Sequence, residues 1–207
     1  MNFGAPNRAY ERLELVPSDY FRHLTRAELP GEGIVPLEID LGCGDGSFLI
    51  DIASHLPERQ FLGVERLLGR VRKVARKAER AGLANLQVLR LESAYTIGWI
   101  LPDACISRVH LLFPDPWPKK RHHKNRFVQP DNIASIKRIL SDRGEFLFKT
   151  DHEGYFEWVK EVMHECKLLT PLGWEESDFY YPETDFERQW KEEGRKIYRA
   201  RFGKNLG

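Results

Sequence analysis

A regular alternation of short apolar segments with amphipathic segments, beginning at residue 34, most constrains how this chain can fold. Apolar runs occupy residues 34–41, 60–64, 86–91 and 106–113, and a stretch with helical spacing follows each of them. Parallel strands need a long crossover between them, and an α-helix is the usual one. The pattern therefore predicts an α/β fold with a mostly parallel, doubly wound sheet and helices on both faces.

The expected helices and the C-terminal strands complete this outline. Helical stretches are expected at residues 47–55, 66–81, 93–100, 131–140 and 152–166. A turn at Gly144 precedes an expected strand at 145–149, and a last, antiparallel strand is expected at 196–202. Residues 1–33 mix charges with prolines and glycines, which favours a loosely attached N-terminal arm, and residues 34–207 then form one domain.

Composition excludes several classes of protein. The chain has 207 residues, of which 42% are apolar, enough for one sizeable core. Lys and Arg number 32 and Asp and Glu 31, so the net charge of +1 excludes a uniformly basic protein that coats nucleic acid. Three cysteines without a CxxC pair argue against a disulfide scaffold or a cysteine-built zinc site, and no metal site is expected. No apolar run approaches about 18 residues, so we expect a cytoplasmic protein without a membrane span.

Three glycines lie where the first predicted strand gives way to a helix. The sequence Asp-Leu-Gly-Cys-Gly-Asp-Gly covers residues 40–46, and glycines there let a ligand approach the backbone closely. The GxGxG spacing is one residue shorter than that of the dinucleotide fingerprint GxGxxG. Asp40 would repel a pyrophosphate and instead suits a ligand with a cationic amine. Two interpretations are open. The glycines could serve only the geometry of the turn, or Asp40, Gly42, Gly44 and Gly46 could bind a cofactor.

Two further acids follow the next two predicted strands. Glu65 ends the second strand, where a carboxylate can accept hydrogen bonds from both ribose hydroxyls of an adenosine. Glu92 follows the third strand, within reach of an adenine edge. The carboxyl ends of parallel strands meet at one edge of the sheet, and ligands of open α/β sheets bind there. An amine, a ribose and an adenine together describe S-adenosylmethionine, which is the expected cofactor.

A proline-rich segment follows the fourth predicted strand. Three prolines within residues 114–118 stiffen the chain around Asp115 and Trp117 at little further cost in entropy. Asp115 is expected to contact the acceptor, and Trp117 to offer a flat apolar face to a base. Residues 119–126 come directly after it and carry five Lys or Arg and two His, which favours phosphate contact over a solvated loop.

A second concentration of basic residues lies in the predicted helix at 66–81. Seven Lys or Arg occur with a single acid, Glu79, between residues 66 and 80. A solvated helix face and a contact with RNA are both open for this stretch. The near-neutral total requires acids elsewhere, and residues 175–193 are rich in them.

The chain resembles the bacterial tRNA (guanine-N7)-methyltransferase family of the TrmB type from residue 34 to about residue 203. The resemblance rests on the acid-x-GxGxG loop, on the string Phe-Pro-Asp-Pro-Trp-Pro-Lys-Lys-Arg-His at 113–122, and on Thr-Asp at 150–151. It also rests on Thr-Asp-Phe-Glu at 184–187, which Ile-Tyr-Arg follows at 197–199. The glycine loop is common to Rossmann-like methyltransferases, whereas the proline-tryptophan string together with a late Thr-x-Phe-Glu is far more specific.

The resemblance implies a Rossmann-like class I methyltransferase fold, S-adenosylmethionine as cofactor and tRNA as substrate. Cofactor contacts are implied at four acids: Asp40, Glu65, Glu92 and Asp115. Substrate contacts are implied at Lys119, Asp151, Thr184, Asp185, Phe186 and Glu187, and RNA contacts at Arg121, His122, His123, Lys124, Asn125 and Arg126. Asp40 stands where relatives typically have Glu, and Asn125 where many have Arg. The complete motif set indicates that no obligatory protein partner is needed, and a monomer or homodimer is expected.

The expected reaction is methylation of guanine N7 in the variable loop of tRNA. N7 carries a lone pair in the ring plane and no proton, so its alkylation needs alignment with the sulfonium methyl but no general base. Asp115 is the expected catalytic residue, because a carboxylate favours the positive charge that develops on the purine. Asp151, Thr184 and Glu187 are expected to select guanine by its amide and amine edge. Lys119 is expected to hold a neighbouring phosphate.

Three alternatives stay open at the level of sequence. The acceptor could instead be an exocyclic base amine of RNA or DNA, since such methyltransferases carry an Asp-Pro-Pro-aromatic sequence at the same strand end. A non-catalytic RNA-binding protein could retain a residual cofactor pocket, but it would have no need for the complete set of acids. A small-molecule methyltransferase would have no use for the basic run.

Overall fold

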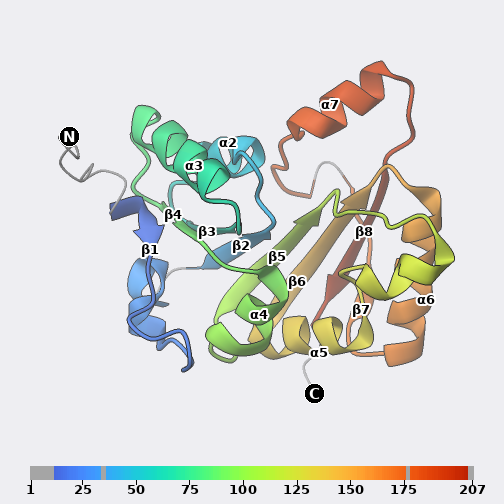
Figure 1. Cartoon of the computed structure of the whole chain (residues 1–207), viewed down its shortest axis with the longest axis horizontal. Coiled ribbons are helices and arrows are strands. Elements are labelled where there is room, and N and C mark those ends of the chain that lie inside the picture. The colour runs from blue at the N-terminus through green and yellow to red at the C-terminus, as the bar shows by residue number, and fades with distance from the viewer. Residues whose placement is uncertain (1–11, 34–35, 176–177, 205–207) are drawn as a thin grey trace.

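The computed structural model describes residues 12–33, 36–175 and 178–204, and within them eight strands form one mixed sheet. The strands are β1 (Glu14–Leu15), β2 (Leu37–Leu41), β3 (Gln60–Val64), β4 (Leu86–Leu89), β5 (Ile106–Leu112), β6 (Leu140–Thr150), β7 (Thr170–Leu172) and β8 (Tyr198–Gly203). Their order across the sheet is β1-β4-β3-β2-β5-β6-β8-β7 (Figure 1). Neighbours from β1 to β6 run parallel, whereas β8 is antiparallel to both β6 and β7. The predicted fold class is confirmed.

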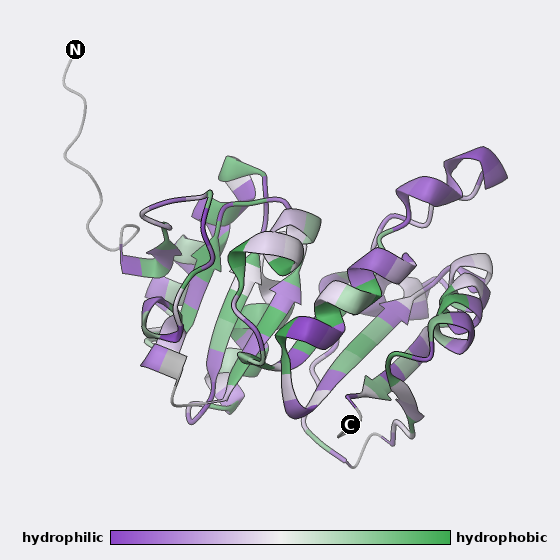
Figure 2. Ribbon diagram, turned by 90° about the horizontal axis from the view of Figure 1, so that it is seen from below, coloured by the Kyte–Doolittle hydropathy of each residue, from purple (hydrophilic) through white to green (hydrophobic). Residues whose placement is uncertain are grey.

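Helices cover both faces of the sheet. The helical segments are η1 (Arg26–Glu28), η2 (Pro30–Gly33), α2 (Ser47–His55), α3 (Leu68–Arg80), α4 (Ser93–Tyr95), η3 (Thr96–Ile100), η4 (Lys120–Asn125), α5 (Pro130–Ile139), α6 (Glu153–Cys166) and α7 (Asp185–Glu192). Helices α2 and α3 pack on one face, and η3, α5 and α6 pack on the other (Figure 1). Figure 2 shows hydrophobic residues gathered on the strands and hydrophilic residues on the outer turns of the helices. Among the described residues, no helix is long and apolar enough to cross a membrane.

Successive side chains of the central strands point to opposite faces, and one of these faces is polar. Ile39 of β2 and Val109 of β5 belong to the core beneath α5 and α6. Because the side-chain period of a strand is two, Glu38, Asp40 and His110 point to the other face. All three are nearly or completely buried. Strands β2 and β5, which are mainly apolar in the sequence, therefore carry a row of buried polar side chains on the sheet face that α2 covers.

The first helix and the second strand of the predicted series form with the predicted bounds, at residues 47–55 and 60–64. Helix α3 is two residues shorter at its start than the expected stretch and one shorter at its end. It buries Val71, Val74, Ala75 and Ala78, whose spacing of three and four residues places them on one side of the helix. The basic residues of α3 therefore lie around the remaining, outer surface.

The described part of the N-terminal arm packs onto the domain. Strand β1 extends the sheet by pairing parallel to β4, and Leu13, Leu24 and Leu29 are buried in the core. The chain is also tied down where the Leu24 amide donates to the Ile100 carbonyl at 2.8 Å. The prolines and charges of the arm predicted a loose attachment. The three leucines instead bury apolar surface against the domain, and they are too widely spaced to form a recognisable apolar segment in the sequence. The start of the first predicted strand, residues 34–35, lies outside the described residues.

The C-terminal third differs from the sequence prediction in three places. Strand β6 extends from Leu140 to Thr150, so the expected turn at Gly144 is instead an irregular stretch of strand with a register shift opposite β5. A side chain on Gly144 would lie 2.9 Å from the Ser141 carbonyl oxygen, which explains the glycine. Strand β7 and helix α7 were not predicted. The last strand begins two residues later than expected, at Tyr198, and ends at Gly203.

Candidate active site

A pocket of about 330 Å³ lies at the carboxyl ends of β2 and β5. The glycine loop contributes one wall, and the start of α7, more than 130 residues later in the chain, contributes another. The lining residues are Asp40, Gly42, Cys43, Gly44, Asp45, Ser47, Phe48, Arg70, Lys73, Leu112, Phe113, Thr184, Asp185 and Phe186. The structure therefore brings the acid-x-GxGxG loop and the Thr-Asp-Phe-Glu sequence to one cavity, at the sheet edge where α/β proteins bind ligands.

The loop needs glycine for two different reasons. Gly42, Gly44 and Gly46 have φ angles of 75°, 58° and 78°, the left-handed region that glycine adopts without cost. At Gly42 a side chain would meet no atom within 4 Å, so that glycine leaves open space beside the backbone. At Gly46 a side chain would lie 2.8 Å from a methyl group of Val74, so that glycine permits close packing of α2 on α3.

Asp40 and Glu65 form a pair of buried acids beside this loop. Asp40 is 3% exposed and Glu65 5% exposed. Burial, reinforced by the nearby Glu65 carboxylate, raises the pKa of Asp40 to about 7. Glu65 accepts a hydrogen bond from the Leu67 amide at 2.8 Å, and Arg70 lies 3.6 Å away. Within the described residues no side chain or amide donates to the Asp40 carboxylate, so a cation that enters the pocket would relieve an existing repulsion.

The other two loop-edge acids have different surroundings. Glu92 is exposed at the N-terminus of α4, where its carboxylate accepts from the Tyr95 amide at 2.7 Å. Asp45, which the sequence did not single out, lines the pocket and accepts from Lys77 at 2.9 Å and Lys73 at 3.0 Å. Partial burial opposes its ionisation, but these two ammonium groups hold the pKa of Asp45 well below its usual range. Asp45 is thus neutralised within the chain, whereas Asp40 is not.

The proline-rich segment, residues 113–118, has two residues in the left-handed region. Phe113 has φ 52° and Trp117 has φ 43°, and a proline follows each of them. Residues before proline normally adopt extended backbone, and a left-handed non-glycine residue costs about 1 to 3 kcal/mol. Strain of this kind is found at functional sites, where the surrounding structure holds it. Asp115 lies between these two residues, exposed, and makes no hydrogen bond to any other described residue.

The basic segment, residues 119–126, divides into an exposed part and one buried residue. Lys119, Arg121, Lys124 and Asn125 are exposed, and His122 and His123 are half-buried against Trp117 and Trp158. Arg126 is only 3% exposed. Its guanidinium donates to the Pro116 carbonyl at 2.9 Å and to the Gly154 carbonyl at 3.1 Å. The expected RNA contact does not fit this burial, because Arg126 instead fixes the proline-rich segment to the N-terminal end of α6.

The Thr-Asp-Phe-Glu sequence forms the N-terminal end of α7. The Thr184 hydroxyl caps the helix by accepting from the Glu187 amide at 2.9 Å. The Glu187 carboxylate is buried and accepts from the Lys149 ammonium at 2.8 Å. Asp185 accepts a hydrogen bond from the Ser47 hydroxyl at the start of α2, directly after the glycine loop, and Phe186 is 55% exposed. Asp151, at the end of β6, accepts from Arg195 at 3.1 Å and does not line the pocket.

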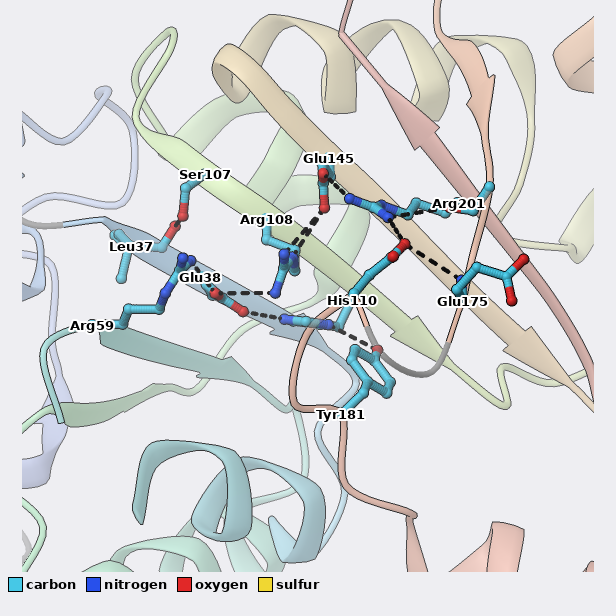
Figure 3. Close-up of polar contacts among 12 residues, drawn as sticks. Leu37, Glu38, Arg59, Ser107, Arg108, His110, Glu145, Glu175, Tyr181 and Arg201 are labelled. Carbon is cyan, nitrogen blue, oxygen red and sulfur yellow. Dashed lines mark hydrogen bonds and ion pairs between the residues drawn. The ribbon is translucent and has the colours of Figure 1, made fainter. Parts of the chain in front are cut away.

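A buried polar network crosses the sheet beneath the chain that leads to α7 (Figure 3). His110 of β5 is 2.8 Å from Glu38 through Nε2 and 2.9 Å from the Tyr181 hydroxyl through Nδ1. Burial lowers the pKa of His110 in spite of Glu38, whereas burial of Glu38 is outweighed by His110, Arg108 and Arg59, which lower its pKa to about 2. The carboxylate can only accept, so Nε2–H donates to Glu38 and the Tyr181 hydroxyl donates to Nδ1.

The same chain segment, residues 178–184, has anchors on several elements. The Asp178 carboxylate accepts from Arg201 of β8 at 2.9 Å. The Tyr180 hydroxyl donates to Asp51 of α2 at 2.7 Å. Together with the Tyr181 contact to β5, these bonds fix the approach to Thr184 from three sides. Glu38 and His110 sit at alternate positions of two apolar strands, and such polar interruptions are the sequence signal that could have located this network.

The order and direction of the strands define the fold of this protein as that of a Rossmann-like class I methyltransferase. The 16S rRNA methyltransferase KamB aligns with a TM-score of 0.61 and 16% identity over 82% of this chain and 88% of its own. The aminoglycoside resistance methyltransferase NpmB1 aligns with a TM-score of 0.58 and 17% identity over 88% and 95%. A geranyl diphosphate C-methyltransferase in complex with S-adenosyl-L-homocysteine aligns with a TM-score of 0.53 and 12% identity over 82% and 70%. These identities establish the fold alone.

Sequence comparison identifies the family. A family model described as "Putative methyltransferase" matches residues 35–200. The tRNA (guanine-N(7)-)-methyltransferase of Staphylococcus epidermidis is 37% identical over 175 residues, which cover 82% of this chain and 81% of that protein. The enzyme of that name from Halalkalibacterium halodurans is 35% identical over 169 residues, 80% of this chain and 76% of its own. The chain belongs to the tRNA (guanine-N(7)-)-methyltransferase family, as its motifs predicted.

Proposed function

We propose that this protein transfers a methyl group from S-adenosylmethionine to N7 of a guanosine in the variable loop of tRNA. The relatives that carry this name align over four fifths of the chain. The observation that supports the proposal most directly is the single pocket into which the glycine loop and the Thr-Asp-Phe-Glu sequence both project. We place the reaction in the cytoplasm, and a monomer or homodimer without an obligatory protein partner stays a prediction.

The residues of the pocket suit the cofactor by their chemistry. S-adenosylmethionine supplies an activated methyl group on a positively charged sulfur, next to a cationic amine. Asp40 is a buried acid with a raised pKa and no donor within the described residues, so it gains most from a cationic ligand. Glu65 and Glu92 follow the next two strands at the same edge, and we assign them to the ribose and the adenine. Gly42, Gly44 and Gly46 supply the approach to the backbone.

Methylation at N7 requires the protein to align the nitrogen lone pair with the methyl group and to stabilise the positive charge that develops. The nitrogen has an available lone pair and no proton to lose, so the chain needs no general base. Positive charge moves from the sulfur to the purine during transfer, and a nearby carboxylate stabilises the charge that develops. Asp115 suits this role because it is exposed just beyond the end of β5 and has no partner within the described residues, while Pro114 and Pro116 restrict the backbone on both sides of it. We therefore assign Asp115 as the catalytic residue.

The remaining assignments fall on both sides of the pocket. Lys119 and the exposed basic residues, Arg121, His122, His123, Lys124 and Asn125, extend from the proline-rich segment and suit the phosphates of the substrate. Asp151, held by Arg195, is assigned to the amide edge of guanine. Thr184 and Glu187 act through the position of α7, because their side-chain groups already have partners inside the protein. Asp185 and Phe186 line the pocket and remain available to either ligand.

The deciding experiment is transfer from labelled cofactor to unmodified tRNA, with the modified nucleoside identified after digestion. We expect 7-methylguanosine at one position of the variable loop. Methyl transfer to an exocyclic amine of a base would refute the N7 assignment, and cofactor binding without any transfer would favour the non-catalytic alternative.

The role of Asp115 is tested in the same assay by Asp115→Ala, with Asp142→Ala as the matched control. Both carboxylates are exposed, and Asp142 lies in the irregular part of β6, at the opposite edge of the sheet. Asp115→Ala should lower kcat by about 100-fold or more while the melting temperature is unchanged, as expected for loss of one charge-stabilising group. Asp142→Ala should behave as the wild type, and full turnover by Asp115→Ala would exclude a catalytic role for that carboxylate.

A further inference from the structure

The outer surface of α3 carries a row of exposed arginines. Arg72, Arg76 and Arg80 follow one another at intervals of four residues, and all are exposed. No carboxylate or other acceptor among the described residues pairs with any of them. Glu79 is the one acid on the helix itself, three residues after Arg76 and directly before Arg80. Four residues of α-helix rise about 6 Å, so the row presents three cations at regular spacing along one line.

The other cations of α3 have partners and belong to the pocket. Lys73 and Lys77 bind Asp45, and Arg70 lies 3.6 Å from Glu65. Arg70 and Lys73 also line the pocket. Helix α3 therefore has two kinds of basic residue. Arg70, Lys73 and Lys77 lie beside the acids Glu65 and Asp45, whereas the arginines of the row are exposed to solvent. Arg72 precedes the pocket-lining Lys73 by one residue, and Arg76 and Arg80 follow it along the helix.

The burial of the apolar side of α3 limits the kinds of partner that this helix can bind. Val71, Val74 and Ala78 are completely buried against the sheet, so the apolar face of α3 has no surface to offer a membrane or a partner helix. What remains exposed is charge, and mainly arginine, whose guanidinium suits phosphate oxygens in a bidentate geometry. With a net charge of +1 for the whole chain, this concentration of positive charge is local.

We propose that Arg72, Arg76 and Arg80 of α3 form a second contact surface for the phosphate backbone of the RNA substrate. The inference deepens the proposed function and rests on it. Helix α3 and the basic segment, residues 119–126, lie on opposite sides of the glycine loop (Figure 1). An RNA that contacts both surfaces passes over the pocket between them, which directs one nucleotide of the RNA to the cofactor. The contact is with the backbone and carries no base specificity of its own.

The test removes the three charges together in Arg72→Gln/Arg76→Gln/Arg80→Gln and measures tRNA binding at several salt concentrations. Each lost phosphate contact lowers the slope of log affinity against log salt by about 0.7 to 0.9, so the slope should fall by about 2. At 0.1 M salt the affinity should fall about 100-fold, and the difference from the wild type should shrink as salt rises. The affinity for S-adenosylmethionine and kcat at saturating tRNA should be unchanged, because no pocket residue is altered.

A charge-matched control separates this surface from a general loss of positive charge. Lys137→Gln/Lys160→Gln/Lys167→Gln removes three exposed or half-exposed lysines from α5, from α6 and from its C-terminal end, with the same change in net charge. This control should bind tRNA with the wild-type salt slope. Equal slopes for all three proteins would overturn the proposal, as would a triple arginine variant that lost affinity for anionic phosphatidylserine vesicles but kept its affinity for tRNA.

The readout also separates this proposal from the proposed function. If the wild type binds tRNA without methylating it, the methyltransferase assignment fails, while the salt slopes still test the arginine row. If methylation occurs and the slopes coincide, the function stands and the arginine row is a solvated helix face. A fall in slope for the arginine variant alone supports the second RNA surface.

Discussion

The buried ion pair between Lys149 and Glu187 fixes α7 onto the end of β6, and its removal has a calculable effect. Both residues are 4% exposed, with 2.8 Å between Nζ and the carboxylate oxygen. Lys149→Met would leave the Glu187 carboxylate buried without this partner, and breaking such a pair from one side costs about 3 to 5 kcal/mol. The half-exposed Lys191 ammonium, 3.7 Å from the same carboxylate, places the expected loss near 3 kcal/mol.

Urea unfolding and thermal unfolding measure this loss. For a chain of about 200 residues a loss of 3 kcal/mol lowers the melting temperature by about 10 °C. Glu187→Gln should cost a similar amount, whereas the double variant Lys149→Met/Glu187→Met, which removes both charges, should lie within about 1 kcal/mol of the wild type. The double-mutant cycle should therefore give a coupling energy above about 2 kcal/mol. A loss below about 1 kcal/mol for Lys149→Met, or additive single effects, would refute the argument.

The double variant also decides what Glu187 does. If its role is to hold α7, Lys149→Met/Glu187→Met should retain methyl transfer with little change in KM for tRNA. If the carboxylate contacts guanine directly, the double variant should be stable and inactive. The resemblance to relatives implies a substrate contact, whereas the buried ion pair supports the positional role, and this single variant separates them.

Changes at Asp40, Gly46 and Arg126 have further expected outcomes. With a pKa of about 7 for Asp40, cofactor affinity should fall about tenfold between pH 8 and pH 6, and Asp40→Asn should abolish this dependence in calorimetry. The pKa of Asp40 is raised in the folded state, so its contribution to stability is present below about pH 4 and lost as pH rises through 7; Asp40→Asn should therefore melt higher than the cofactor-free wild type at pH 8. Gly46→Ala should cost about 2 kcal/mol in urea unfolding, and Val74→Ala should restore only part of it, because the clash is relieved but φ stays at 78°. Arg126→Ala should lower the melting temperature by several degrees, whereas Arg121→Ala should leave it unchanged and lower the salt slope of tRNA binding by about 1.

The elements that the sequence predicts well are those whose stability comes from burial on one side. α2 and β3 have strong apolar patterns and clear ends, and they form with the predicted bounds. Helix α7 has no such pattern: Glu187 is its one buried residue, so an ion pair to a distant strand holds it rather than an apolar face. Strand β7 is exposed at each of its three residues and has no burial period for the sequence to reveal. Both α7 and β7 form because of tertiary contacts, and these contacts cannot be recognised in the local sequence.

The candidate site shows the same division. The glycines and Asp40 were predictable, because a strand followed by GxGxG has one geometry, and that geometry places the acid at the ligand edge. The burial of Arg126 was not predictable, because nothing in the sequence distinguishes this arginine from its exposed basic neighbours. What distinguishes it is a pair of carbonyl acceptors, at Pro116 and Gly154, and the second is 28 residues away. Long-range acceptors of this kind are visible only in the folded chain.

The anchoring of residues 178–184 has a consequence for how the enzyme is made. The segment is bonded to Arg201 of β8 and, through His110, to Glu38 of the central strand β2. Synthesis runs from the N-terminus, so the glycine loop leaves the ribosome long before its opposite wall can be fixed. A nascent or prematurely terminated chain that ends before Arg201 would contain nearly every site residue and still lack a completed pocket. The segment should therefore be fully anchored only after Arg201 has emerged.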